Sequence, residues 1–420
     1  VIGDWSSDVC SSDLISIMKD SYKCYEKVLI VIVTAIVLCF SVHVRASGVG
    51  NKESAQEIVN EYFSLIGNDW DKFAELYTNE QINSFKNFLE NEKNIREYVG
   101  VLNVRKAKLI ESIEIKYDDV KDMIDEDYTG KKIKIFAVGA DYDVYEDTKY
   151  FSEGIIYNFL ILEEQNGQWR VNTLMQIADP SLLKMKGYHF QSDYNITENI
   201  MEARENGYLV NGKGKVFSDI NEKEIDGSLV DEYAILNKRT VPTDDTTISY
   251  GTYKNGVYQN RKSIKFHDYC KGVSAGEVRG KSFDGTARKA VDIAIKTYTW
   301  HYKIVPIDPT HSVDIKNTMQ SYKPEKISEN KKVTSDYNAV KNIWMESYKG
   351  NIFAAGYGAG DYNSSGKNGG RLMQNGCRYL VDKKKYSFYQ CLHYYYDYSI
   401  DGSTGGPLRF FDNNKIDLGK

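Results

Sequence analysis

The chain has 420 residues, a formal net charge of −5 and 41% hydrophobic residues. This length predicts two or three domains with substantial hydrophobic cores. A mildly acidic chain without a long run of like charge lacks the basic surface of a general nucleic-acid binder, so we expect no nucleic-acid partner. The 33 tyrosines suit ordinary cores and surfaces, or the stacking of sugars on aromatic rings.

The N-terminus is predicted to be an export signal preceded by a foreign segment. Residues 1–17 repeat a Ser-Ser-Asp triplet and resemble a translated sequencing adapter, so we treat them as an artefact. Residues 18–46 carry early lysines and then an apolar run of about fifteen residues, the length of a signal-peptide core and short for a membrane span. We expect an exported protein at the cell surface, in the cell wall or outside the cell. The segment is either cleaved after Ala46 or kept as an anchor, the only expected contact with a membrane.

Three cysteines remain after this leader: Cys270, Cys377 and Cys391. Export would permit one disulfide and leave one thiol over. The spacing selects no pair, and unpaired buried cysteines are the alternative.

Residues 54–179 are predicted to form an α+β domain with its helices first. Apolar residues recur at helical spacing from Ile58 to Leu89. Strands are expected at 132–140, 155–162 and 168–174, with Asn166-Gly167 as a hairpin turn between the last two. This order resembles the cone-shaped nuclear-transport-factor family. The resemblance implies a pocket-forming spacer or recognition module, and fold alone does not give its function.

Residues 180–230 are polar and mixed, which is typical of a linker or of a small β-insert. From 231 to 268 the sequence favours strands, at 233–236, 247–250 and 263–266, and Asn255-Gly256 predicts another hairpin turn.

A segment rich in small residues ends in a single acid, Glu277. Asp284 is a good N-cap for the amphipathic helix expected after it, whose inward face runs from Ala287 to Tyr302. An acid at a segment end beside such a helix is a candidate proton donor. The alternative is a solvated glutamate near a helix end.

These segments resemble the SpoIID/LytB domain family. Residues 269–278 read YCKGVSAGEV where the family carries Y-L-K-G-V-V-A-x-E-M, and the next helix matches "A-L-K-A-Q-A-V-A-A-R-T-Y-A" with Lys296 in place of the usual arginine. Shorter blocks follow in the family's order, at 320–322, 339–340, 348–350, 369–376 and 386–395. The ordered succession, over roughly residues 233–399, is more specific than any single block.

The resemblance implies a multidomain α+β protein whose residues 231–420 form a SpoIID/LytB-like domain. The family cleaves peptidoglycan glycan strands as lytic transglycosylases, or stimulates cell-wall amidases. Its acid falls on Glu277, and the chemistry needs a carboxylic acid that still holds its proton near neutral pH. A second carboxylate is not required, because the C6 hydroxyl of the muramic acid can attack.

The other residues expected to contact the glycan are Lys296, Tyr298, Gln374, His393, Tyr394 and Tyr395. The alternative to glycan contact for Lys296 is that it is a solvated residue on the helix surface. For the tyrosines the alternative is that they belong partly to the hydrophobic core. We expect no cofactor and no metal, because the cysteines that hold zinc in some members are missing before Gln320. The expected partners are peptidoglycan glycan strands and a cell-wall amidase.

Two departures from the family pattern favour other functions. Asn368 stands where the family has a histidine, and Leu372-Met373 replaces its Met-Ser. A non-catalytic peptidoglycan-binding or amidase-stimulating protein is therefore the alternative to an enzyme. A third hypothesis is a surface adaptor that binds a protein or small ligand through residues 54–179.

Overall fold

The computed structural model describes residues 53–121, 123–124, 128–177, 180–190, 194–225, 239–278, 283, 285–399, 406–414 and 416–419, with the backbone alone at 180–182 and 194–199. The expected artefact (1–17), export signal (18–46), strand at 233–236 and capping residue Asp284 lie outside these residues.

The described chain begins with helices, as predicted. They are α2 (Ala55–Leu65), α3 (Trp70–Glu75), α4 (Ile82–Glu90), α5 (Glu92–Arg96) and the 3₁₀ helix η1 (Gly100–Asn103). A capping box begins α2: the Ser54 hydroxyl accepts the backbone N–H of Glu57, whose carboxylate accepts that of Ser54. Asp69 and Asn91 cap α3 and α5 in a similar way.

A four-stranded antiparallel sheet follows, in the order β1-β2-β3-β4. Its elements are β1 (Val104–Ile115), β2 (Ile133–Val144), β3 (Gly154–Gln165) and β4 (Gln168–Gln176), with the short helix α6 (Tyr117–Val120) after β1. The turn predicted at Asn166-Gly167 is confirmed, since Gln165 pairs with Gln168 and both turn residues have positive φ, as a type I′ turn requires. Strand β1 was not predicted: it is an edge strand with many charged residues.

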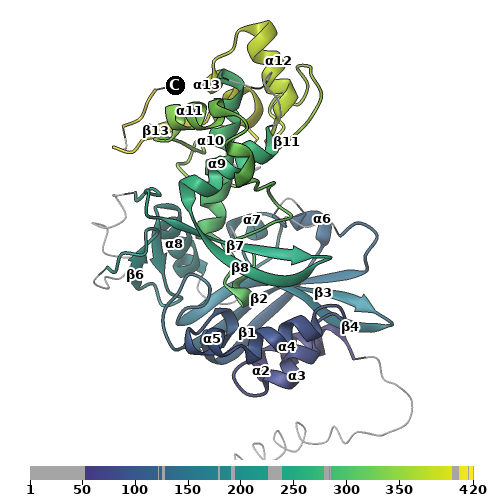
Figure 1. Cartoon of the computed structure of the whole chain (residues 1–420). Coiled ribbons are helices and arrows are strands. Elements are labelled where there is room, and N and C mark those ends of the chain that lie inside the picture. The colour runs from purple at the N-terminus through teal and green to yellow at the C-terminus, as the bar shows by residue number, and fades with distance from the viewer. Residues whose placement is uncertain are drawn as a thin grey trace, which may run out of the picture. The chain divides into compact units, whose positions relative to one another are not determined.

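The two faces of this sheet belong to two hydrophobic cores. Helices α2 to α4 cover one face (Figure 1), where Phe136, Val138 and Leu160 pack against the aromatic residues of the helices. Residues of the opposite parity, such as Ile135 and Phe159, face a second core that continues into the C-terminal half.

Residues 180–225 contain two helices and a short hairpin. They are α7 (Pro180–Met185), α8 (Tyr194–Glu205), β5 (Tyr208–Val210) and β6 (Val216–Asp219), and β5 pairs with β6. This region therefore has a small hydrophobic core of its own around Val210 and Val216, and its assignment as a linker or a small insert stays a prediction.

A second hairpin joins the insert to the C-terminal helices. Strands β7 (Thr247–Lys254) and β8 (Val257–Lys265) pair across the predicted Asn255-Gly256 turn, and β9 (Ile315–Lys316) pairs parallel to β7. The turn is again type I′, with φ of 52° and 78°. Phe266, which was expected to end the strand, is the first residue of the next helix.

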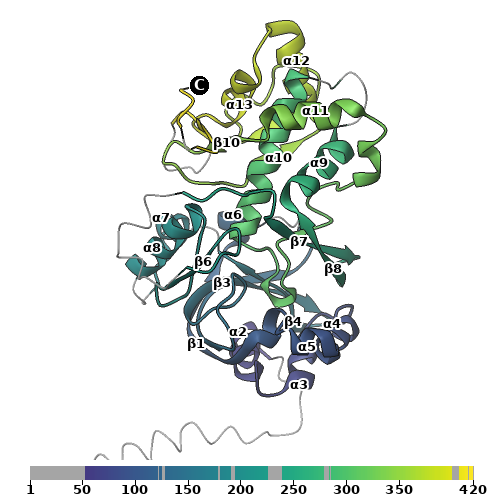
Figure 2. The ribbon, with the colours of Figure 1, turned by 60° about the vertical axis from the view of Figure 1, so that its left-hand side comes forward.

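The C-terminal half is built around helix α10, which contacts α9, α11, α12, α13, β10 and β11; it runs through the middle of these elements (Figure 2). The elements are α9 (Phe266–Glu277), α10 (Thr286–Ile304), η3 (Pro309–His311), η4 (Pro324–Ile327), α11 (Lys331–Val340), β10 (Ile343–Glu346), β11 (Gly356–Gly358), β12 (Arg371–Met373), α12 (Gln374–Lys384), α13 (Phe388–Tyr396) and β13 (Arg409–Asp412). Almost every residue of α10 is buried, the small residues expected to face inward among them.

The fold class is α+β, as predicted. Residues Glu53–Lys420 form one compact unit, so the domain boundaries expected near 179 and 231 stay predictions. Among the described residues, no helix combines the length and the apolar character needed to cross a bilayer.

Candidate active site around Glu277

Helix α9 carries Glu277 at its last position, where two glycines bring another segment against the helix. A Cβ on Gly276 would overlap the carbonyl oxygen of Ser321, and one on Gly272 would overlap the ring of Tyr322. Gly272 and Gly276 are four residues apart and therefore lie on the same helical face. The small residues of α9 thus allow the segment at 320–322 to lie directly on it.

This contact fixes the Glu277 carboxylate. Its Oε1 accepts the backbone N–H of Ser321 at 2.7 Å. Within the described residues, Oε2 has no hydrogen-bond partner, and the side chain is half-buried. The carboxyl group is therefore held in one direction and keeps one oxygen available.

Tyr357 on β11 and Gln320 complete the immediate surroundings. The Gln320 side-chain amide donates to the Tyr357 hydroxyl at 2.7 Å. Burial raises the pKa of Tyr357, and the negative charge of Glu277 raises it further. The phenol therefore stays protonated beside the acid, and three segments distant in sequence meet at this point.

Tyr298 lies next to this group. Its ring centroid is 6.1 Å from that of Tyr357 in an edge-to-face arrangement and 4.8 Å from that of Tyr302. The side chain is 7% exposed, so it offers only an edge to a ligand.

Lys296 is placed away from any surface. Its side chain is fully buried, and its ammonium donates to the carbonyl oxygens of Val340, Lys341 and Ile343 at 2.5–2.8 Å. It also lies 4.5 Å from the ring centroid of Trp344. Burial lowers the pKa of Lys296 to about 7. The residue holds the end of α11, and its contact with a glycan stays a prediction that this burial does not support.

The remaining predicted residues gather on α12 and α13. Gln374 begins α12, is 6% exposed, and its Nε2 has no hydrogen-bond partner among the described residues. His393 Nδ1 lies 2.8 Å from Asp397 Oδ1. The Tyr394 hydroxyl donates to the Ser364 carbonyl oxygen, whereas Tyr395 is buried.

The short parallel pair β11 and β12 connects the two groups. Tyr357 pairs with Leu372, two residues before Gln374. Helix α10 supports both groups, because it contacts β11, α12 and α13 as well as α9. The structure thus gives Glu277, Tyr298, Gln374 and the α13 residues a common scaffold.

A buried polar stripe on α10 lies behind Glu277. Arg288 is fully buried and donates to the carbonyl oxygens of Ser274 and Val278 at 3.4 and 3.3 Å, on either side of Glu277. Asp292, one turn further, is also fully buried, and neither of its oxygens accepts a hydrogen bond within the described residues, although the nearby Ser274 hydroxyl favours its ionised form. Burial outweighs that effect and raises the pKa of Asp292 to about 7.

Sequence reasoning did not include Tyr357 or Arg288 in the site, whereas Asp292 is one of the three aspartates, with Asp268 and Asp284, that it offers if a second carboxylate is used. Gln320 stood in a recognised block but received no role. Tyr357 lies on a three-residue strand within a glycine-rich stretch, so no periodic pattern marks it.

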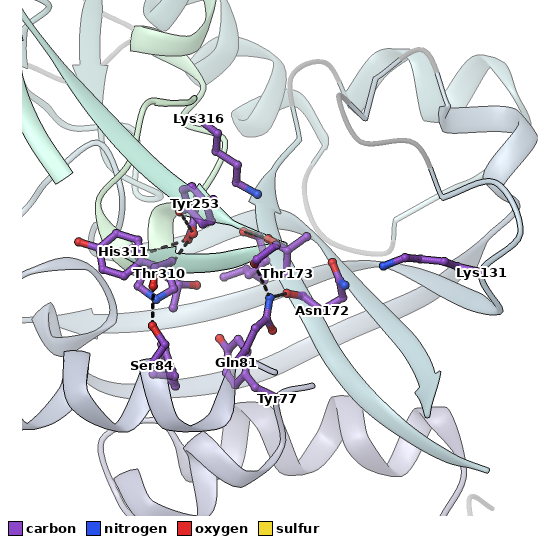
Figure 3. A pocket seen from close by; sticks show the side chains of 15 residues that line it. Tyr77, Gln81, Ser84, Lys131, Asn172, Thr173, Tyr253, Thr310, His311 and Lys316 are labelled. Atoms are coloured by element: carbon purple, nitrogen blue, oxygen red, sulfur yellow. Dashed lines mark hydrogen bonds and ion pairs between the residues drawn. The ribbon is translucent and has the colours of Figure 1, made fainter. Parts of the chain in front are cut away.

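The described cavities lie elsewhere. One of about 80 Å³ is lined by helix α4, strand β4, the β7–β8 hairpin and η3 (Figure 3). In it, Asp308 accepts from the Tyr253 hydroxyl at 2.5 Å and pairs with His311 Nδ1 at 2.7 Å. Burial would raise the pKa of Asp308, but the charge and hydrogen bond of His311 outweigh it and lower that pKa to about 2. A groove of about 1260 Å³ runs past Lys149 and Lys303, and neither cavity is lined by Glu277.

Among the described residues, no group of three or more His, Cys, Asp or Glu side chains is arranged to hold a metal ion. Comparison of the chain with protein-family models, with curated proteins and with solved structures found no match.

Proposed function

We propose that this chain is an exported cell-wall protein whose C-terminal half cleaves peptidoglycan glycan strands, in the manner of a lytic transglycosylase, with Glu277 as acid and base. The proposal includes a SpoIID/LytB-like domain over residues 231–420 and a cone-like module over residues 54–179. Glycan strands are the substrate, and no cofactor takes part.

The observation that carries this proposal is the meeting of separate blocks at Glu277. The block at 269–278 contains the acid, and the block at 320–322 donates a backbone N–H to it. Helix α10, which carries the block that follows residue 278, contacts α9 and donates to Gln320 through the Thr299 hydroxyl. These blocks lie far apart in the sequence. Their meeting at one carboxyl group supports the proposal, because a catalytic acid has to be held in a fixed position.

The chemistry requires two proton transfers at one carboxyl group. Glu277 gives its proton to the glycosidic oxygen as the bond to the muramic acid breaks. The C6 hydroxyl of that muramic acid then attacks C1, and the Glu277 carboxylate accepts the hydroxyl proton. A 1,6-anhydro ring forms, no water is consumed, and the acid is restored. Oxygen Oε2, which has no partner within the described residues, is the atom available for both transfers.

Neighbouring side chains have supporting roles in this scheme. The Ser321 N–H holds Oε1, so the carboxyl group cannot rotate freely. Tyr298 and Tyr357 supply an aromatic edge on which a sugar can rest. His393 and Tyr394, which are half-buried, would contact the strand further along, whereas the burial of Gln374 and Tyr395 does not support such a contact.

The test is digestion of purified glycan strands, stripped of stem peptides, by residues 47–420. We expect 1,6-anhydromuramyl products from the wild type and none from Glu277→Gln. The matched control is Glu325→Gln, the same change at an exposed glutamate of the adjacent η4, which should leave the products unchanged. Products of equal yield from Glu277→Gln would refute the assignment.

Asn368 supports a second candidate, a non-catalytic glycan-binding or amidase-stimulating protein. The residue replaces the family's histidine and lies in a left-handed turn with φ of 53°. A binder would retain the strands in a pull-down assay, or accelerate a cell-wall amidase, without releasing anhydro sugars. That outcome would favour the non-catalytic protein over the glycan-cleaving enzyme.

A further inference from the structure

Two of the three described cysteines meet where helices α12 and α13 cross. Cys377 on α12 and Cys391 on α13 are both fully buried. The Cys391 Sγ donates to the Cys377 carbonyl oxygen at 3.9 Å. The third cysteine, Cys270, lies on α9 near Lys296 and Tyr337.

The helices are in close contact at this point for a steric reason. A Cβ on Gly376, the residue before Cys377, would overlap the hydroxyl oxygen of Tyr395, which is one turn after Cys391. The contact of α12 with α13 therefore depends on a small residue beside the cysteine pair. The two thiols also interact directly: a hydrogen bond with Cys391 is the largest cause of the raised pKa of Cys377, with burial next.

We propose that Cys377 and Cys391 form a disulfide when the chain reaches an oxidising compartment, and that Cys270 remains a thiol. The inference depends on the export included in the proposed function, but not on the activity of Glu277. It selects one of the three pairings that the sequence leaves open.

The reaction is a thiol–disulfide exchange with an oxidant that carries a disulfide, either a protein or a small molecule such as oxidised glutathione. The thiolate of one cysteine attacks one sulfur of this disulfide, expels the other sulfur as a thiolate and forms a mixed disulfide. The thiolate of the second cysteine then displaces the first sulfur of the oxidant. The two cysteines lose two electrons and two protons, and the oxidant gains them. Because both sulfurs are buried in the folded chain, the exchange takes place during folding.

The bond would join the two helices that carry Gln374 and His393 to Tyr395. Only 13 residues lie between the cysteines, so the closed loop is short, and a loop of this size restricts the unfolded chain substantially. Cys270 lies on a different helix, α9, and is fully buried, so no oxidant reaches it once the chain has folded.

The direct test is mass spectrometry of protein collected from the surface or medium of the producing cells, with thiols blocked at once by N-ethylmaleimide. Trypsin cuts after Arg371, Arg378 and Lys385, so the cysteines fall in separate peptides, 372–378 and 386–409. We expect these peptides joined, two hydrogens lighter than their sum, and peptide 266–271 with a free Cys270. Blocked thiols on both Cys377 and Cys391 would overturn the proposal.

A second experiment separates the pairing from export. The reduced chain, residues 47–420, is refolded with oxidised glutathione, and its melting temperature is measured with and without dithiothreitol. We expect reduction to lower the melting temperature by roughly 5 °C in the wild type and in Cys270→Ser, and to have no effect on Cys391→Ser.

The two experiments together distinguish the possible failures. If the refolded chain does not form the link, the pairing is wrong. If the link forms readily in vitro but the protein from cells carries free thiols, the error lies in the export on which the proposal rests.

Discussion

At the scale of single residues, the site consists of one carboxyl group and the donors that fix it. Glu277 is held by the Ser321 N–H, and Tyr357 is held by Gln320. None of these contacts uses a charged partner for Glu277. The position of the acid therefore depends on backbone geometry and on neutral hydrogen bonds.

Replacing Tyr357 by Phe should lower the rate of glycan cleavage without unfolding the protein. The change leaves the Gln320 amide without its acceptor beside Glu277, and a lost buried hydrogen bond costs roughly 1–3 kcal/mol. We expect kcat/KM to fall about tenfold and the melting temperature to change by only a few degrees. The control is Tyr362→Phe, whose exposed hydroxyl bonds Asp382; an equal loss in both variants would argue against a role for Tyr357.

Asp292 should make stability depend on pH. Burial raises its pKa from 3.8 to about 7, so between these values the folded state binds more protons than the unfolded chain. The free energy of unfolding should therefore fall as the pH rises from about 4 to 7, by at most about 4 kcal/mol. The pKa of Lys296 is lowered from 10.5 to about 7. Between these values the unfolded chain binds more protons than the folded state, so the free energy of unfolding should rise as the pH rises from about 7 to 10.5.

Denaturant titrations at several pH values test this directly. Asp292→Asn should flatten the decline between pH 4 and 7 and leave the alkaline rise attributed to Lys296. If the free energy of unfolding of Asp292→Asn declined by the same amount between pH 4 and 7, groups other than Asp292 would be responsible for the decline.

At the scale of elements, α9 and the segment at 320–322 depend on two glycines. Gly276→Ala should force these segments apart, because the new methyl group would overlap the Ser321 carbonyl oxygen. We expect a loss of roughly 1–3 kcal/mol in the free energy of unfolding and a larger loss of cleavage, since the Ser321–Glu277 hydrogen bond would be displaced. Gly356→Ala is the control, as its Cβ would meet no atom closer than 3.9 Å; equal effects of the two changes would contradict this explanation.

The sequence predicts elements well where the determinants are local. Asn166-Gly167 and Asn255-Gly256 need only positive φ at two successive residues, and the structure confirms both hairpins. Strand β1 escaped prediction because an edge strand tolerates many charged residues. The sequence also identifies Glu277 as a candidate acid, because the residues around it that carry the family resemblance are contiguous in the chain.

Other features depend on tertiary structure and leave no local signal. Lys296 is buried because three carbonyl oxygens at the end of α11 receive its hydrogens, and its own helix does not reveal that neighbour. Tyr357 lies on a three-residue strand, close enough for the charge of Glu277 to raise its pKa. The proximity of Cys377 to Cys391 likewise depends on how two helices cross.

At the scale of the whole molecule, the first sheet and the C-terminal half are joined by buried polar contacts. Lys149 pairs with Asp314 at 2.5 Å, with side chains 8% and 0% exposed. The Tyr150 hydroxyl and the Ser249 N–H also donate to Asp314. Nearby, the Gly100 N–H donates to the Ser312 hydroxyl at 2.7 Å. The 308–314 turn therefore connects the two halves.

Removing Asp314 should weaken this connection strongly. Asp314→Ala leaves Lys149 buried without its counter-charge, and breaking such a pair costs roughly 3–5 kcal/mol. The double change Lys149→Met with Asp314→Ala should recover part of the loss in thermal denaturation. Lys72→Met, at an exposed pair with Asp69, is the control and should change stability little, because solvent screens such a pair. Similar losses at the two sites would contradict the importance of the junction.

The central claim, that Glu277 transfers a proton in glycan cleavage, is tested most directly by the mass of the products. Transglycosylation yields fragments that end in 1,6-anhydromuramic acid, each lighter by one water than the product of hydrolysis. We predict such fragments from the wild type and from Glu325→Gln, and their absence from Glu277→Gln folded to the same melting temperature. Hydrolysed ends from the wild type, or anhydro ends from Glu277→Gln, would contradict the account.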